Sequence, residues 1–263
     1  MSAIVVKEGL VHYEAIGRGQ PLVLIHGWLG SWRYWVPAME ELSAQYKTYA
    51  LDLWGFGDSD KPNMYYNINA YVELVTNFLD QLGVGQGPLP IVGHALGGIV
   101  ALLFAAQAPE RVKQVMGVSV PLASAAIGRP LTSFSGNGDA LARLVTRRAN
   151  FPEVNMEARK ADTAAIAGSV NSALEQDIRR VLPPINIPVL LLYGENDPLI
   201  KPPQPEWLQD CANNVRPILM KKTQHFPMLE EQNKFNRLLM DFLDAGDDLD
   251  SLELKDEWQR RLR

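Results

Sequence analysis

Short, continuous apolar runs recur along the chain, and most are followed by a segment whose apolar residues have helical spacing. Uninterrupted runs of this length are typical of strands buried on both faces of a parallel sheet. Two further short strands are expected within residues 3–16, on either side of Glu8-Gly9. The expected buried strands span residues 22–25, 46–51, 91–92, 112–120, 189–193 and 216–220.

Helical spacing is clearest in residues 68–82, where apolar side chains recur at intervals of three and four residues. Those side chains are Ile68, Tyr71, Val72, Val75, Phe78, Leu79 and Leu82. Further helices are expected at residues 32–44, with Ser31 as the N-cap, and at residues 230–243.

This alternation of strand and helix predicts an α/β fold with an eight-stranded, mostly parallel sheet flanked by helices. Residues 121–184 interrupt the alternation, because they contain several helical patterns and no clear strand. We therefore expect a core formed by residues 1–120 and 185–243, and a small helical cap, or lid, formed by residues 121–184. Residues 244–263 are expected to be a charged C-terminal tail.

Composition and charge limit the classes of partner. The 263 residues are 47% hydrophobic and 21% charged, which is typical of a folded globular protein. The net charge of −5 argues against a nucleic-acid partner. The single cysteine, Cys211, excludes an internal disulfide bond. The N-terminus lacks the pattern of a signal peptide and no window has 18 apolar residues, so we expect no transmembrane segment and a cytoplasmic location.

The stretch Gly93-His94-Ala95-Leu96-Gly97 carries the most specific chemical signal. An apolar run enters a glycine-flanked turn there, and an alanine-rich helical segment leaves it. The pattern matches the G-x-S-x-G nucleophile elbow, with Ala95 in place of the serine. Residues 93–98 also differ at only one position from a dinucleotide-binding fingerprint. Ala95 would obstruct the approach of a pyrophosphate, however, and that fingerprint normally follows the first strand of the sheet.

Three other motifs follow expected strands. His26-Gly27-Trp28 follows the strand at 22–25, and Asp52 to Ser59 has the pattern D-x-x-G-x-G-x-S after the strand at 46–51. Asp197 lies in Gly194-Glu195-Asn196-Asp197-Pro198, in which Glu195 is the weaker acidic candidate. His225 follows the last strand in Gln224-His225-Phe226-Pro227.

Together these motifs resemble the α/β-hydrolase superfamily, in particular its cap-bearing esterase and epoxide-hydrolase-like members, over about residues 3–243. The resemblance implies a triad at Ala95, Asp197 and His225, in the chain order that this superfamily uses. It also implies an oxyanion hole formed by the backbone N–H groups of Trp28 and Leu96. His26 is interpreted as a structural histidine that holds the loop, and the turn at 52–59 is interpreted as structural too.

The substrate pocket is expected at the carboxyl ends of the strands, where α/β sheets bind ligands. Trp28, His94, Trp54 and Phe226 are the expected substrate-binding residues. Their character suggests a small-molecule ester with an apolar portion. We expect no cofactor and no metal site, because His12, His26, His94 and His225 are scattered and have no cysteines at ligand spacing.

Ala95 has no hydroxyl and excludes catalysis through a covalent serine intermediate at this position, because loss of a triad serine lowers turnover on the order of a millionfold. Ser119 is not an obvious substitute, since it lies on a different strand without an elbow motif. One interpretation is an esterase whose serine was replaced deliberately, which leaves it inactive. A second is a natural binding protein that carries alanine. A third is an enzyme in which His225, oriented by Asp197, acts as a general base without a nucleophilic side chain.

The tail contains an acidic segment and then a basic one. Leu254, Trp258 and Leu262 recur every four residues and could form one stripe of a helix. A frayed tail and a helix that binds a partner or a second copy of the chain are the two interpretations of this pattern.

Overall fold

The computed structural model describes residues 2–7, 9–134, 136, 138–146, 151–211, 213–246, 249 and 252. An eight-stranded sheet forms its centre, with the strand order β1-β2-β4-β3-β5-β6-β7-β8. The strands are β1 (Ser2–Val6), β2 (Gly9–Gly17), β3 (Gln20–Ile25), β4 (Tyr46–Leu51), β5 (Leu89–His94), β6 (Val112–Val118), β7 (Val189–Gly194) and β8 (Val215–Met220).

The strands β3 to β8 are parallel to one another, whereas β2 is antiparallel to both β1 and β4. The expected eight-stranded, mostly parallel sheet is therefore confirmed. Strands β5 and β7 are buried over their whole length, which explains why their sequences are mostly apolar instead of alternating.

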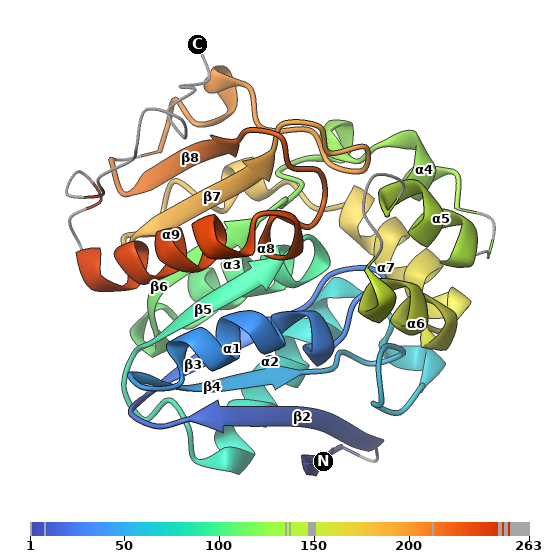
Figure 1. Cartoon of the computed structure of the whole chain (residues 1–263), viewed down its shortest axis with the longest axis horizontal. Helices are drawn as coiled ribbons and strands as arrows, with labels where there is room; N and C mark the ends of the chain where they lie inside the picture. Colours follow the sequence, from blue (N-terminus) through green and yellow to red (C-terminus); the bar gives the residue numbers. More distant parts are fainter. Residues whose placement is uncertain are drawn as a thin grey trace.

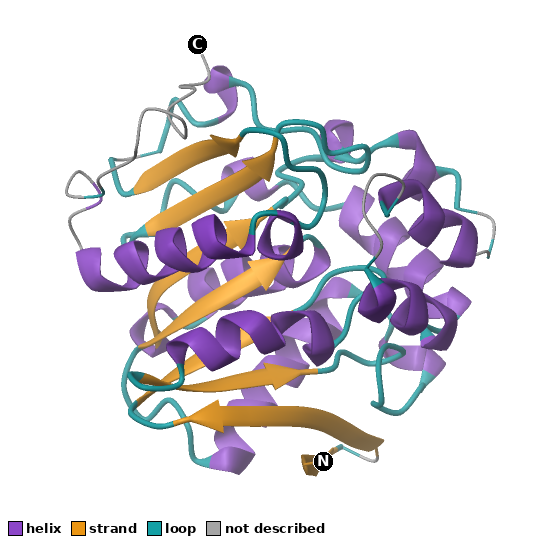
Figure 2. Cartoon of the chain, in the orientation of Figure 1, coloured by secondary structure: helices purple, strands orange, loops and turns teal. Residues whose placement is uncertain are grey.

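Helices cover both faces of the sheet (Figures 1 and 2). Figure 1 shows α1, α8 and α9 in front of the strands, with α2 and α3 behind them. These helices are α1 (Val36–Leu42), α2 (Ile68–Leu82), α3 (Leu96–Gln107), α8 (Pro227–Glu230) and α9 (Gln232–Ala245). The helix α2 begins at the N-cap Asn67, whose side chain accepts from the Ala70 N–H, and it ends at Gly83 in the left-handed conformation.

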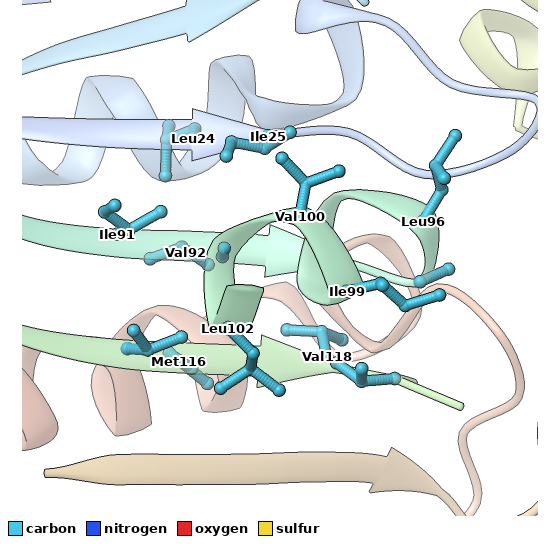
Figure 3. Packing of buried hydrophobic residues seen from close by; sticks show 14 of the residues in the cluster. Leu24, Ile25, Ile91, Val92, Leu96, Ile99, Val100, Leu102, Met116 and Val118 are labelled. Carbon is cyan, nitrogen blue, oxygen red and sulfur yellow. The ribbon is translucent and has the colours of Figure 1, made fainter. Parts of the chain in front are cut away.

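The helix α3 is apolar on all sides, because it lies between the sheet and other helices. Ile99, Val100 and Leu102 are buried among side chains of β3, β5 and β6 (Figure 3). Strand β5 and helix α3 flank residue 95, and the close packing of both fixes the position of the turn between them.

The described part of the segment between β6 and β7 contains four α-helices, which gather beyond the carboxyl ends of the strands (Figure 1). They are α4 (Arg129–Thr132), α5 (Gly138–Val145), α6 (Pro152–Lys160) and α7 (Thr163–Leu174). None of the described residues in 121–184 joins the eight-stranded sheet. We call helices α4 to α7 the cap helices.

Three boundaries differ from those expected. The segment expected as one helix at 32–44 is divided into a 3-10 helix, Trp32–Trp35, and α1. Strand β6 ends at Val118, two residues early, because Ser119 has a φ of 48° and leaves the extended conformation. The last helix begins at Gln232 and is preceded by the separate turn α8.

The expected stripe of the C-terminal tail lies outside the described residues. None of the helices in the described part of the chain is long and apolar enough to cross a membrane.

Candidate active site

Ala95 occupies a strained turn between β5 and α3. Its φ and ψ are 48° and −107°, a conformation that residues with a side chain rarely adopt. Its N–H donates to the Val118 carbonyl at 2.8 Å, and its side chain is fully buried. A Cβ at Gly97 would collide with the backbone carbonyls of Ile25 and His26, so the turn requires glycine there. Residue 95 therefore lies at a sharp, strained turn between strand and helix, which we call the elbow.

Asp197 and His225 meet at the carboxyl ends of β7 and β8. The His225 Nδ1–H donates to Asp197 Oδ2 at 2.9 Å, and both side chains are buried. The other carboxylate oxygen of Asp197 accepts from the N–H groups of Leu199 and Ile200, at 2.8 and 3.0 Å. Within the described structure, the buried His225 Nε2 has no hydrogen-bond partner. The carboxylate thus fixes the tautomer that leaves Nε2 free to accept a proton.

The loop His26-Gly27-Trp28 lies against the elbow. A Cβ on Gly27 would lie 2.9 Å from the Ala95 Cβ, which shows how closely the two segments pack. The Gly27 N–H donates to the Tyr34 hydroxyl at 2.6 Å. Among the described residues, no acceptor is found for the backbone N–H groups of Trp28 and Leu96. Both are therefore free to donate to a ligand.

His26 holds this loop in place, as expected. Its Nδ1–H donates to the Gly27 carbonyl at 2.9 Å, and its Nε2 accepts from the Leu53 N–H at 2.9 Å. Complete burial lowers the pKa of His26, which keeps the ring neutral and lets Nε2 act as an acceptor.

His94, expected to contact substrate, instead has both ring nitrogens bound to protein groups. Its Nδ1 lies 3.0 Å from the Tyr34 hydroxyl, and its Nε2 lies 2.8 Å from the His225 carbonyl oxygen. The structure therefore leaves no ring nitrogen of His94 for a substrate. The sequence motif did not indicate Tyr34, because the signal lies in a hydroxyl placed by the 3-10 helix at 32–35.

The other three residues expected to bind substrate are aromatic and buried. The Trp28 indole donates to Ser169 Oγ on α7 at 2.9 Å and so ties the loop to the cap helices. Phe226 packs edge-on against Phe151, with ring centroids 6.3 Å apart, and against His225. Trp54 packs against Tyr65 instead, at 6.0 Å.

Ser119 shares one property with Ala95. Its φ is also 48°, and its hydroxyl is buried without a hydrogen-bond partner in the described structure. Its N–H donates to the Leu192 carbonyl at 2.7 Å. Ser119 therefore lies just past the end of β6, not on the strand as expected, and no glycine-flanked elbow surrounds it.

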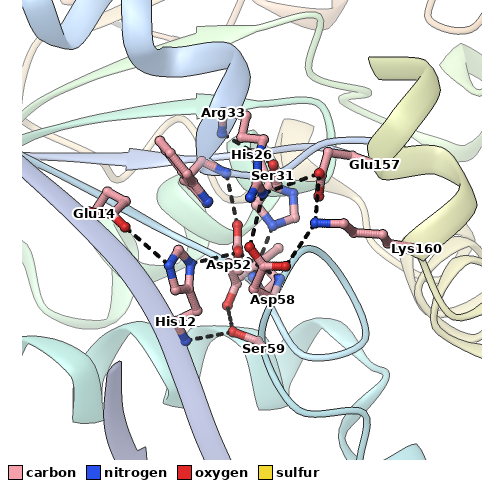
Figure 4. Close-up of polar contacts among 12 residues, drawn as sticks. His12, Glu14, His26, Ser31, Arg33, Asp52, Asp58, Ser59, Glu157 and Lys160 are labelled. Atoms are coloured by element: carbon pink, nitrogen blue, oxygen red, sulfur yellow. Dashed lines mark hydrogen bonds and ion pairs between the residues drawn. The ribbon is translucent and has the colours of Figure 1, made fainter. Parts of the chain in front are cut away.

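The turn at 52–59 is held by its own buried aspartate (Figure 4). The two oxygens of Asp52 accept from the Trp32 N–H at 2.8 Å, the Asp58 N–H at 2.9 Å and the His12 ring at 2.9 Å. His12, Asp52 and Asp58 place possible ligand atoms within 4.8 Å of one another. These donors already occupy the oxygens of Asp52, and Asp58 is paired with Arg33 and Lys160, so the group fits a structural network better than a cation site.

A cleft of about 490 Å³ lies at the opposite edge of the sheet, where the parallel strands begin. It contains Lys47 and Lys113 and none of the residues of the elbow or of the Asp197–His225 pair. Its lining is Gly19, Gln20, Pro21, Lys47, Tyr49, Gly83, Val84, Gly85, Gln86, Gly87, Pro88, Pro90 and Lys113. This cleft is therefore separate from the site described above.

Comparison with known proteins finds one matching family and several proteins of similar sequence. The family described as "alpha/beta hydrolase fold" matches residues 20–166. A pimeloyl-[acyl-carrier protein] methyl ester esterase from Nitrosomonas europaea is 28% identical, over 86% of this chain and 96% of the relative. A soluble epoxide hydrolase from Corynebacterium sp. strain C12 is 26% identical, over 86% of this chain and 90% of the relative.

Solved structures resemble the whole chain. The N-acyl homoserine lactonase AidH, as a serine-to-glycine mutant with N-hexanoyl homoserine lactone, has a TM-score of 0.81 at 18% identity, covering 97% of this chain and 99% of that one. The meta-cleavage product hydrolase CumD from Pseudomonas fluorescens IP01, as a serine-to-alanine mutant, has a TM-score of 0.79 at 20% identity, covering 93% and 98%. These likenesses establish the fold.

Proposed function

Because this chain belongs to the α/β-hydrolase fold family, we propose that its site is that of a carboxylic ester hydrolase lacking only its nucleophilic oxygen. The observation that carries this proposal is the Asp197–His225 pair at 2.9 Å, with a buried and unpartnered Nε2 beside an elbow that presents Ala95. One of the relatives named above is a methyl ester esterase, which supports ester hydrolysis as the chemistry of this site.

With a serine at position 95, the remaining groups have defined roles. His225 Nε2 would take the hydroxyl proton as the oxygen attacked the ester carbonyl, while Asp197 stabilised the imidazolium. The N–H groups of Trp28 and Leu96 would donate to the oxyanion, each contributing roughly 3–4 kcal/mol to the transition state. His225 would then protonate the leaving alcohol, and a water activated by the same nitrogen would release the acid.

The proposed substrate is a small ester with an apolar acyl or aromatic portion. Support comes from the buried aromatic side chains of Trp28 and Phe226 near the pair, and from Phe151 of the segment that leads into α6. Apolar surroundings favour burial of hydrocarbon, whereas a charged acyl group would lose its hydration there.

Alanine at position 95 predicts a chain that binds ester and does not cleave it. Because the Asp197–His225 pair is in place, a deliberate replacement that traps substrate and a natural binding protein both fit the geometry. A third function, general-base catalysis by His225 alone, is favoured by one observation, the unpartnered Nε2. One substitution separates these three functions.

The test is hydrolysis of short and medium p-nitrophenyl esters by the chain, by Ala95→Ser and by Ala95→Ser/His225→Ala. We expect a gain of several orders of magnitude in kcat/KM for Ala95→Ser, which the double variant loses. An inert Ala95→Ser, together with tight binding of ester by the unmodified chain, would identify a binding protein. Activity in the unmodified chain that His225→Ala abolishes would identify general-base catalysis.

A further inference from the structure

Four groups from separate segments form one continuous line of hydrogen bonds beneath the elbow. The Gly27 N–H lies 2.6 Å from the Tyr34 hydroxyl, which lies 3.0 Å from His94 Nδ1, and His94 Nε2 lies 2.8 Å from the His225 carbonyl oxygen. Tyr34 and His94 are both buried. The line therefore joins three segments: the loop His26-Gly27-Trp28, which we call the oxyanion loop, the elbow, and the loop that carries His225.

The direction of each hydrogen bond follows from chemistry. A carbonyl oxygen can only accept, so His94 Nε2 carries the proton and donates to the His225 carbonyl. Nδ1 of the neutral ring is then an acceptor, so the Tyr34 hydroxyl must donate to it. The hydroxyl oxygen in turn accepts from the Gly27 N–H. Each hydrogen bond in the line thus has one direction, and a protonated His94 would have to donate from Nδ1 and so reverse its hydrogen bond with Tyr34.

The neutral state of His94 follows from its surroundings. Complete burial lowers the pKa of His94 well below 6.5, and the neighbouring His225 lowers it further. The ring is also fixed by aromatic contacts, since its centroid lies 4.6 Å from that of His225 and 5.2 Å from that of Phe226. His94 thus has a single tautomer and a single orientation.

This line of hydrogen bonds also determines which backbone N–H group of the loop is available to an oxyanion. Because Tyr34 accepts the Gly27 N–H, the next amide in the loop, that of Trp28, is the one left free. A Cβ on Gly27 would lie 2.8 Å from the His94 carbonyl oxygen and 2.9 Å from its Nδ1, so loop and elbow are already in direct contact. A change in the Tyr34–His94 pair would therefore move the Trp28 amide relative to residue 95.

We propose that Tyr34 and His94 are positioning residues that hold the oxyanion loop and the His225 loop at fixed places relative to the elbow. This inference rests on the proposed ester hydrolysis, because the placement matters only if residue 95, His225 and the Trp28 amide act together. Misplacement by about 1 Å costs on the order of a hundredfold in rate. The pair thus acts through other groups and needs no contact with substrate.

The first test uses the chain as it exists and needs no activity. Nitrogen-15 NMR of the histidine rings should show His94 neutral, with the proton on Nε2, from pH 5.5 to pH 8. Tyr34→Phe should shift the resonances of the His225 ring and the Trp28 amide. Tyr71→Phe is the matched control, since Tyr71 is equally buried and donates to the Trp54 carbonyl outside the line. It should leave those resonances in place.

The second test measures hydrolysis in the Ala95→Ser background. Tyr34→Phe should lower kcat at least about tenfold with little change in KM, whereas Tyr71→Phe should leave both constants near their starting values. His94→Gln, whose amide can still donate to the His225 carbonyl, should retain more activity than His94→Leu.

The outcomes are separable. Proton on Nδ1 of His94, titration of that ring near pH 6.5, or unchanged His225 and Trp28 resonances in Tyr34→Phe would overturn the positioning role whatever the activity. Equal kcat losses for Tyr34→Phe and Tyr71→Phe would also overturn it. An inert Ala95→Ser, by contrast, would contradict the proposed ester hydrolysis and leave the NMR result to decide the geometry.

Discussion

At the scale of single residues, Ala95 is under backbone strain that its side chain does not relieve. A φ of 48° with a ψ of −107° is a backbone conformation that costs an L-residue on the order of 1–3 kcal/mol. In a serine hydrolase that strain presents the nucleophile. Here the strain persists although no hydroxyl is present, so the turn is maintained by packing: Ala95 lies against Gly27, and Gly97 lies against the backbone of Ile25 and His26.

Substituting Ala95→Gly tests this strain. Glycine adopts positive φ freely, and this gain exceeds the entropy that glycine loses on folding, so we expect the free energy of unfolding to rise by about 1 kcal/mol. Ala101→Gly is the control, because Ala101 is also buried but lies within α3, where glycine should lower stability by about 1 kcal/mol or more. Urea denaturation of both variants checks the prediction, and a destabilised Ala95→Gly would show that the turn is not strained.

At the scale of elements, α6 is held to the core by charged side chains (Figure 4). Arg33 from the core contacts Asp58 at 3.0 Å and the buried Glu157 of α6 at 3.2 Å. Lys160 of α6 contacts Asp58 at 2.8 Å and Glu157 at 3.2 Å. Burial raises the pKa of Glu157 despite these cations. Two positive and two negative groups thus alternate where a cap helix meets the turn at 52–59.

Asp58 gives this attachment a defined pH dependence. Burial alone would raise its pKa, but the hydrogen bonds from Lys160 and Arg33 outweigh burial and lower the pKa from 3.8 to about 2. A lowered carboxylate pKa stabilises the folded state above pH 4, and that contribution is lost as pH falls through about 2. Because Asp58 is partly exposed, screening reduces the contribution to about 1 kcal/mol.

We therefore expect Asp58→Asn to lower the free energy of unfolding by about 1 kcal/mol at pH 6, with the difference shrinking between pH 5 and pH 2. Asp139→Asn is the control. The ion pair of Asp139 with Arg159 is more exposed, and it connects two cap helices to each other instead of connecting a cap helix to the core. Urea denaturation at several pH values measures both variants. A pH-independent difference for Asp58→Asn would contradict the assigned ion pairs.

At the scale of the whole molecule, local sequence patterns were sufficient to predict the sheet. Contacts between residues distant in sequence could be predicted only in part. The run at 46–51 and the spacing at 68–82 match β4 and α2, because burial dictates both patterns. The Asp197–His225 contact was predictable because strand ends converge on one edge of a parallel sheet. The hydrogen bonds of Tyr34 were not, since its hydroxyl joins the Gly27 amide to a ring nitrogen of His94, which is 60 residues away in sequence.

The central claim is that the site lacks one oxygen and nothing else. The most direct measurement is covalent labelling of Ala95→Ser by an alkyl fluorophosphonate, followed by mass spectrometry of the peptide that contains position 95. We expect stoichiometric labelling at that position, none in the unmodified chain, and a rate that falls on the order of a thousandfold or more in Ala95→Ser/His225→Ala. Labelling as slow in Ala95→Ser as in the double variant would contradict the claim that His225 is poised to activate a nucleophile there.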